Sequence, residues 1–189
     1  VERKEPGIYA TVSERTEKLV ADVARFGWDL KPLIDKGMLR LIDLGSLFGA
    51  KVWDRPERVV EAVMSELTGT ARSTGAKRLV VDPLAPPVTA ELPFARQYVH
   101  RVITSVESTL QTTNVMTSEL ATGAHALSRY GAEEHLASGV IILELSRVGD
   151  YFVRKMVIRK MSWNPVHPTV YRFEIEGGRG ITLKERLGH

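Results

Sequence analysis

Short apolar runs alternate with amphipathic stretches over the first two thirds of the chain. β-branched and aliphatic residues cluster in four runs, which predicts strands at 8–12, 38–43, 77–82 and 112–118. Apolar residues recur at helical spacing in three stretches, which predicts helices at 19–26, 55–72 and 94–110. The aliphatic run Leu79 to Val81 is typical of a central strand that is buried on both faces. This order predicts an α/β fold with a mostly parallel sheet flanked by helices.

The pattern changes after residue 138. No long helical stretch separates the remaining apolar runs, which predicts successive strands at 140–145, 151–160, 170–175 and 180–183. The pairs Gly149-Asp150 and Gly177-Gly178 are typical of hairpin turns. The last third of the chain is therefore predicted to form an antiparallel extension. Because neither an internal repeat nor a linker is visible, we expect a single domain over residues 1–189.

Composition narrows the classes of function. The 189 residues contain no cysteine, which excludes disulfides, thiolate nucleophiles and cysteine-ligated zinc. The 26 Lys and Arg against 23 Asp and Glu leave a net charge of only +3, too small to predict nucleic-acid binding. The five histidines lack the spacing of metal ligands, so no structural metal is expected. Without a long apolar segment or a signal sequence, we expect no membrane association and a cytoplasmic location.

Acidic residues stand at the ends of three predicted strands. They are Glu14, Asp82 and Glu119. Ligands of open α/β sheets bind at the carboxyl ends of the strands. An aliphatic strand that ends in Asp82 has the form of a Walker B strand, whose carboxylate holds the magnesium ion of a nucleotide, and a carboxylate at a neighbouring strand end can polarise the attacking water.

Structural interpretations of the same acids stay open. Asp82 is equally consistent with a turn acid that caps the next segment. For Glu14, the structural alternative is an ordinary acid of the first helical turn, with Ser13 or Thr16 as the N-cap.

Other polar residues allow two readings each. Thr117 and Ser118 fit a sensor of the nucleotide's γ-phosphate, or hydroxyls that satisfy backbone groups. Glu133 and Glu134 are adjacent, so a solvated surface is favoured over paired acid–base carboxylates. Four basic residues of a late strand fall on alternate faces, which argues against a nucleic-acid groove; they are Arg154, Lys155, Arg159 and Lys160.

Several motifs occur together in one order along nearly the whole chain. They are Gly27-Trp28-Asp29-Leu30, Gly75 to Asp82, Thr117-Ser118-Glu119, Ser128-Arg129-Tyr130-Gly131-Ala132-Glu133-Glu134, Arg159-Lys160-Met161 and Phe173-Glu174-Ile175. This order resembles KaiC-type domains, the RecA-like ATPases that include the cyanobacterial circadian clock protein and archaeal and bacterial relatives. The resemblance implies a RecA-like sheet, Mg-ATP as the ligand, and a hexameric ring that holds ATP between neighbouring subunits.

The resemblance also implies roles for individual residues. Glu14 corresponds to the glutamate that activates water. The family often has two adjacent glutamates, and this chain has Ser13 in the first of the two places. Asp82 corresponds to the Walker B acid, followed here by Pro83 in place of a small hydroxyl residue. Lys160 corresponds to a lysine that reaches the phosphates of the neighbour's ATP. The family then continues with Arg-Gly-Thr, whereas this chain has Ser162-Trp163-Asn164.

The sequence contains no glycine-rich phosphate loop that ends in Lys-Ser or Lys-Thr. We therefore interpret it as a domain truncated before the family's second core strand. Without the loop, we expect no tight ATP binding by these residues alone, and a monomer or small oligomer instead of the hexamer. The alternatives are a non-catalytic interaction domain that binds a regulatory protein partner and, less favoured, a recombinase-like DNA-binding protein.

Overall fold

The computed structural model describes residues 4–48, 56–85, 92–120, 126–165 and 169–187. The chain forms two compact units, residues 1–136 and 137–189, and each is described by itself. None of the described helices combines the length and the apolar character of a membrane-spanning segment. The assignment of all 189 residues to one domain stays a prediction.

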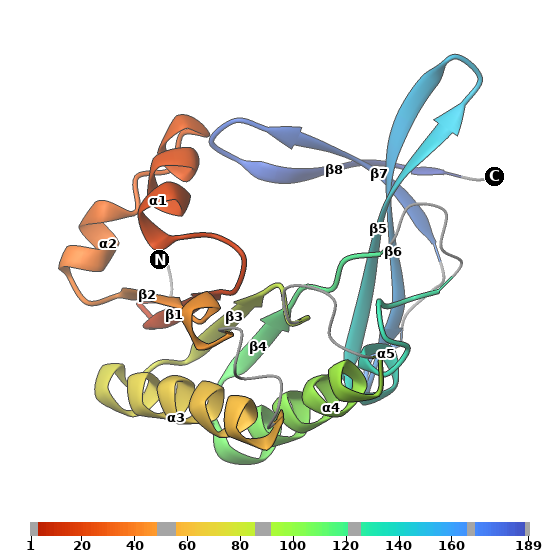
Figure 1. The fold of residues 1–189 in the computed structure, drawn as a ribbon. Coiled ribbons are helices and arrows are strands. Elements are labelled where there is room, and N and C mark those ends of the chain that lie inside the picture. The colour runs from red at the N-terminus through yellow and green to blue at the C-terminus, as the bar shows by residue number, and fades with distance from the viewer. Residues whose placement is uncertain (1–3, 49–55, 86–91, 121–125, 166–168, 188–189) are drawn as a thin grey trace. The chain divides into compact units, whose positions relative to one another are not determined.

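The first unit contains a four-stranded parallel sheet (Figure 1). Its strands are β1 Gly7–Thr11, β2 Leu39–Asp43, β3 Arg78–Asp82 and β4 Thr113–Met116, in the spatial order β2-β1-β3-β4. This confirms the predicted parallel sheet. Thr11 lies opposite Asp43 on one side and Asp82 on the other, so the carboxyl ends of three strands meet at one edge.

Six helices belong to the described part of this unit. They are α1 Thr16–Arg25, α2 Lys31–Asp35, the 3₁₀ helix η1 Gly45–Leu47, α3 Pro56–Thr74, α4 Leu92–Thr109 and α5 Glu133–Leu136. The three long helices occur where the apolar spacing predicts them. The sequence did not indicate α2, η1 or α5, because elements of three to five residues are too short to show a helical period.

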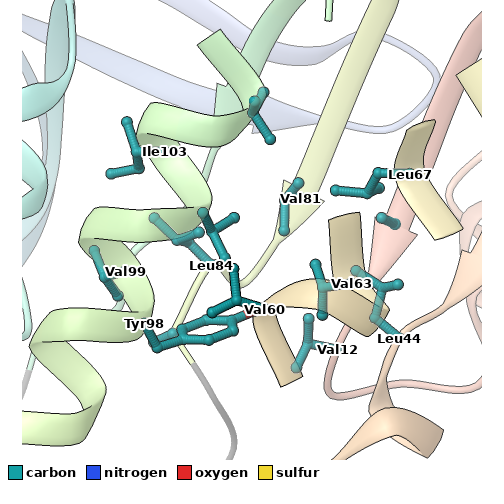
Figure 2. Packing of buried hydrophobic residues seen from close by; sticks show 14 of the residues in the cluster. Val12, Leu44, Val60, Val63, Leu67, Val81, Leu84, Tyr98, Val99 and Ile103 are labelled. Atoms are coloured by element: carbon teal, nitrogen blue, oxygen red, sulfur yellow. The ribbon is translucent and has the colours of Figure 1, made fainter. Parts of the chain in front are cut away.

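The core lies between the sheet and the two longest helices, which pack side by side (Figures 1 and 2). Leu79 and Val81 of β3 are each 1% exposed, and they belong to one core cluster with aliphatic residues of α3 and α4 such as Val63 and Val99. Burying one such side chain stabilises the fold by about 1.5–3 kcal/mol. Val80, on the other face of β3, is only half-buried, so the expectation of burial on both faces is wrong.

The second unit is an antiparallel sheet of four strands in sequence order. The strands are β5 Gly139–Val148, β6 Tyr151–Met161, β7 Val170–Glu176 and β8 Gly180–Leu187. Gly149 takes the left-handed conformation (φ 61°) that the tight turn between β5 and β6 requires. The predicted antiparallel extension is confirmed, and the chain belongs to the α/β class with a RecA-like sheet.

Candidate functional site

The candidate site lies at the carboxyl edge of the parallel sheet. Backbone hydrogen bonds hold the strand exits together there, from the Val12 amide to the Asp82 carbonyl (3.0 Å) and from the Leu44 amide to the Thr11 carbonyl (2.8 Å). Asp43 also ends a strand at this edge, and its carboxylate accepts the Gly45 amide at 2.8 Å. Sequence reasoning missed Asp43, although it ends an aliphatic run just as Asp82 does.

Two hydroxyl groups fix the carboxylate of Asp82. The Tyr9 hydroxyl, from β1, donates to one carboxylate oxygen, and the Thr117 hydroxyl, just after β4, donates to the other. Each oxygen keeps a second lone pair, so the group can still accept from a metal-bound water. Both partners are side chains, Tyr9 of β1 and Thr117 just after β4. A turn acid that caps the next segment would instead accept from backbone amides.

The pKa of Tyr9 reports the negative charge of this site. Burial raises the pKa of the Tyr9 hydroxyl, and the hydrogen bond to Asp82 and the charges of Asp82 and Glu14 raise it further. Tyr9 therefore stays protonated at neutral pH and acts as a hydrogen-bond donor to Asp82. The charge of Glu14 reaches the same hydroxyl, so Glu14 and Asp82 share one electrostatic environment.

Glu14 lies between β1 and α1, and its backbone is fixed while its carboxylate faces solvent. The buried Thr11 hydroxyl accepts the Glu14 amide at 3.0 Å and donates to the Glu14 carbonyl at 2.9 Å. The carboxylate, 40% exposed, pairs with Lys18. Helix α1 begins at Thr16, and Arg15 before it takes the N-cap position without a side-chain hydrogen bond. The alternative with Ser13 or Thr16 as the N-cap is therefore wrong.

The two hydroxyl residues after β4 both donate to carboxylates, and Ser118 also accepts a backbone amide, that of Arg129, at 3.4 Å. Thr117 donates to Asp82, whereas Ser118 donates to Glu133 at 2.9 Å. The 117–118 segment thus joins Asp82 to a second carboxylate that lies outside the sheet.

Glu133 departs most from its prediction. Its side chain is buried, with the residue only 7% exposed, so the expectation of a solvated surface is wrong for it. The Ser128 hydroxyl lies 2.7 Å from Glu133 and also contacts Glu134, so the two adjacent carboxylates converge on one serine. The adjacent pair Glu133-Glu134 could not show this by itself, because one of the donors to Glu133 is Ser118, 15 residues earlier.

Lys160 lies in the second unit, on β6 opposite Val140 and beside a β-bulge. Its role toward a neighbour's phosphates stays a prediction. On the same strand, Lys155 lies opposite Glu144 of β5, so the β5–β6 pair carries both signs of charge. Within the described residues, no group of three or more histidine, aspartate or glutamate side chains has the arrangement of a metal site.

Comparison with known proteins identifies the family. The KaiC ATPase family model matches residues 1–188. The chain belongs to the KaiC ATPase family. The crystal structure of a KaiC-like protein from Pyrococcus horikoshii superposes with a TM-score of 0.80 at 28% identity, over 97% of this chain and 77% of that one.

Two curated relatives support the same assignment. A UPF0273 protein of Aeropyrum pernix is 28% identical over 90% of this chain and 71% of its own length. The circadian clock oscillator protein KaiC of Parathermosynechococcus lividus is 30% identical over 85% of this chain, but over only 30% of its own length. The chain therefore corresponds to a fraction of the KaiC clock protein.

Proposed function

We propose that this KaiC-family domain, in its full-length form, binds Mg-ATP and hydrolyses it at the carboxyl edge of the parallel sheet. The observation that carries the proposal is the arrangement around Asp82. This strand-end carboxylate is held by Tyr9 and Thr117 from the strands on either side, and Glu14 lies within electrostatic reach of the same tyrosine. An oriented carboxylate beside a second, solvated one is what magnesium-dependent water attack needs.

The two carboxylates have separate roles in this proposal. Asp82 would hold the magnesium ion through hydrogen bonds from the water bound to it. The charge of the ion would offset the negative charge of the phosphates. Glu14 orients the attacking water and takes its proton; its exposure leaves room for that water. To accept this proton, the Glu14 carboxylate must separate at least in part from the Lys18 ammonium group. Breaking this ion pair costs little free energy, because both side chains are exposed.

The remaining parts of the site come from other segments. We propose that a phosphate loop outside these 189 residues cradles the phosphates, and that Lys160 acts on the ATP of a neighbouring subunit in a hexameric ring. In the cytoplasm, such a ring would convert hydrolysis into a regulatory change, through contact with a regulatory protein partner. These residues alone would bind ATP weakly.

The proposal is tested by Asp82→Asn in the full-length protein. Asparagine keeps the shape and removes the charge, so we expect the magnesium-dependent part of ATP affinity to fall at least about tenfold, with turnover falling further. Isothermal titration with ATP, in the presence and absence of magnesium, measures the effect. Equal magnesium dependence in Asp82→Asn and the unaltered protein would contradict the proposal and favour the non-catalytic interaction domain.

A further inference from the structure

Glu133 is a buried carboxylate. Among the residues that the structure describes, no lysine or arginine lies within ion-pair distance of it. Its oxygens accept from Ser118 at 2.9 Å and from the amide of Ala132 at 3.1 Å, and they lie 2.7 Å from the Ser128 hydroxyl, whose single proton Glu133 shares with Glu134. Because removing an anion from water is costly, these donors must replace its hydration almost completely. Such an arrangement keeps the partners of Glu133 in one geometry.

The partner that matters most is Ser118, because it follows Thr117 directly. The Thr117 amide donates to the Val81 carbonyl at 3.1 Å, and the Thr117 carbonyl accepts the Leu84 amide at 2.8 Å. The Thr117 hydroxyl donates to Asp82. The two-residue segment 117–118 is thus attached to the exit of β3 on one side and to Glu133 on the other.

We propose that Glu133 is a positioning residue for Asp82: it fixes the exit of β4, so that the Thr117 hydroxyl holds the Asp82 carboxylate in one orientation. The inference rests on the proposed function of Asp82. A carboxylate that binds metal-bound water must direct its lone pairs, and loss of an outer partner typically costs about 10–100-fold in metal affinity or activity. Glu133 itself touches neither the metal nor the nucleotide.

This assignment also changes the reading of Ser118. A hydroxyl has one proton, and in this structure Ser118 donates it to Glu133 while accepting, at 3.4 Å, from the Arg129 amide. The same hydroxyl cannot donate to a γ-phosphate at the same time. Ser118 is therefore the link between Glu133 and the site, not the sensor.

The test uses the full-length ATPase, four single variants and one double variant. Glu133→Gln and Ser118→Ala each remove part of the link, and Ser118 is half-exposed, so its variant keeps the fold. Glu107→Gln and Ser108→Ala are the matched controls, because both residues are exposed at the end of α4. The measured quantities are kcat and the magnesium concentration that gives half-maximal hydrolysis at saturating ATP.

We expect Glu133→Gln and Ser118→Ala to raise the half-maximal magnesium concentration by about 10–100-fold. The double variant should be no worse than the more affected single variant, because both changes break one hydrogen bond. The controls should match the unaltered protein. Should Glu133→Gln not fold, Ser118→Ala alone decides.

Two results would overturn the inference. One is an unchanged magnesium requirement in folded Glu133→Gln and Ser118→Ala. The other is a loss of activity that is additive in the double variant. If the magnesium requirement also stays unchanged in Asp82→Asn, the proposed function itself fails, and the role of Glu133 fails with it.

Discussion

Glu14, after β1, and Glu133, at the start of α5, are two glutamates in opposite surroundings. Glu14 has an exposed carboxylate that pairs with Lys18, whereas Glu133 is buried and, among the described residues, accepts from hydroxyl and amide donors. A carboxylate that takes a proton from water needs access and freedom to move. A carboxylate that holds a segment in place needs complete satisfaction and no freedom. The comparison assigns chemistry to one glutamate and positioning to the other.

The largest expected difference is in stability. Glu133→Ala leaves the Ser118 hydroxyl and the Ala132 amide without their charged acceptor, whereas Ser128 keeps Glu134, and we expect a loss of about 1–3 kcal/mol in the free energy of unfolding. Glu14→Ala removes an exposed ion pair and should cost less than about 1 kcal/mol. Urea unfolding of both variants measures the difference. Equal losses would remove the physical distinction between the two sites.

The dependence of stability on pH sharpens the comparison. Burial raises the pKa of Glu133, but the amides of Glu133 and Ala132 and the hydroxyls of Ser128 and Ser118 together bring that pKa below its ordinary value of 4.5. Since the folded pKa is the lower one, ionised Glu133 contributes stability above about pH 4.5, and this contribution is lost as the pH falls through the folded pKa.

Glu133→Gln cannot titrate and should therefore lose less stability than the unaltered chain on acidification. Thermal unfolding between pH 6 and pH 3 measures this, with Glu17→Gln, an exposed acid of the first turn of α1, as the control. An identical pH profile for Glu133→Gln and the unaltered chain would show that Glu133 is not held in its ionised form.

The smallest expected effect concerns the cation beside Glu14. Lys18 pairs with both Glu14 and Asp22, and all three side chains are exposed. Lys18→Met should leave the free energy of unfolding nearly unchanged, because solvent screens exposed pairs. Calorimetry of the variant checks this. A clear loss of stability would mean that the pair fixes Glu14, which a mobile general base does not allow.

The sequence predicted the strands from their aliphatic and β-branched runs, and the three long helices from apolar residues at helical spacing. Leu79 to Val81 marks β3 without any knowledge of the fold, and the shared edge of the strand ends at Thr11 and Asp82 follows once the strands are parallel neighbours. The environment of Glu133 could not be predicted, since its donor Ser118 lies 15 residues earlier in the chain. The start of α1 was also missed, because Thr11 of the preceding strand binds Glu14 in place of a local cap.

The most direct test of the central claim is single-turnover hydrolysis of Mg-ATP by Glu14→Gln in the full-length protein. Glutamine keeps the shape and lacks the basicity, so we expect ATP affinity to be retained and hydrolysis to fall by about 10²–10⁴-fold. Glu17→Gln, three residues along the chain, should hydrolyse at the normal rate. Normal hydrolysis by Glu14→Gln would contradict the account and leave Glu14 as a surface acid beside α1.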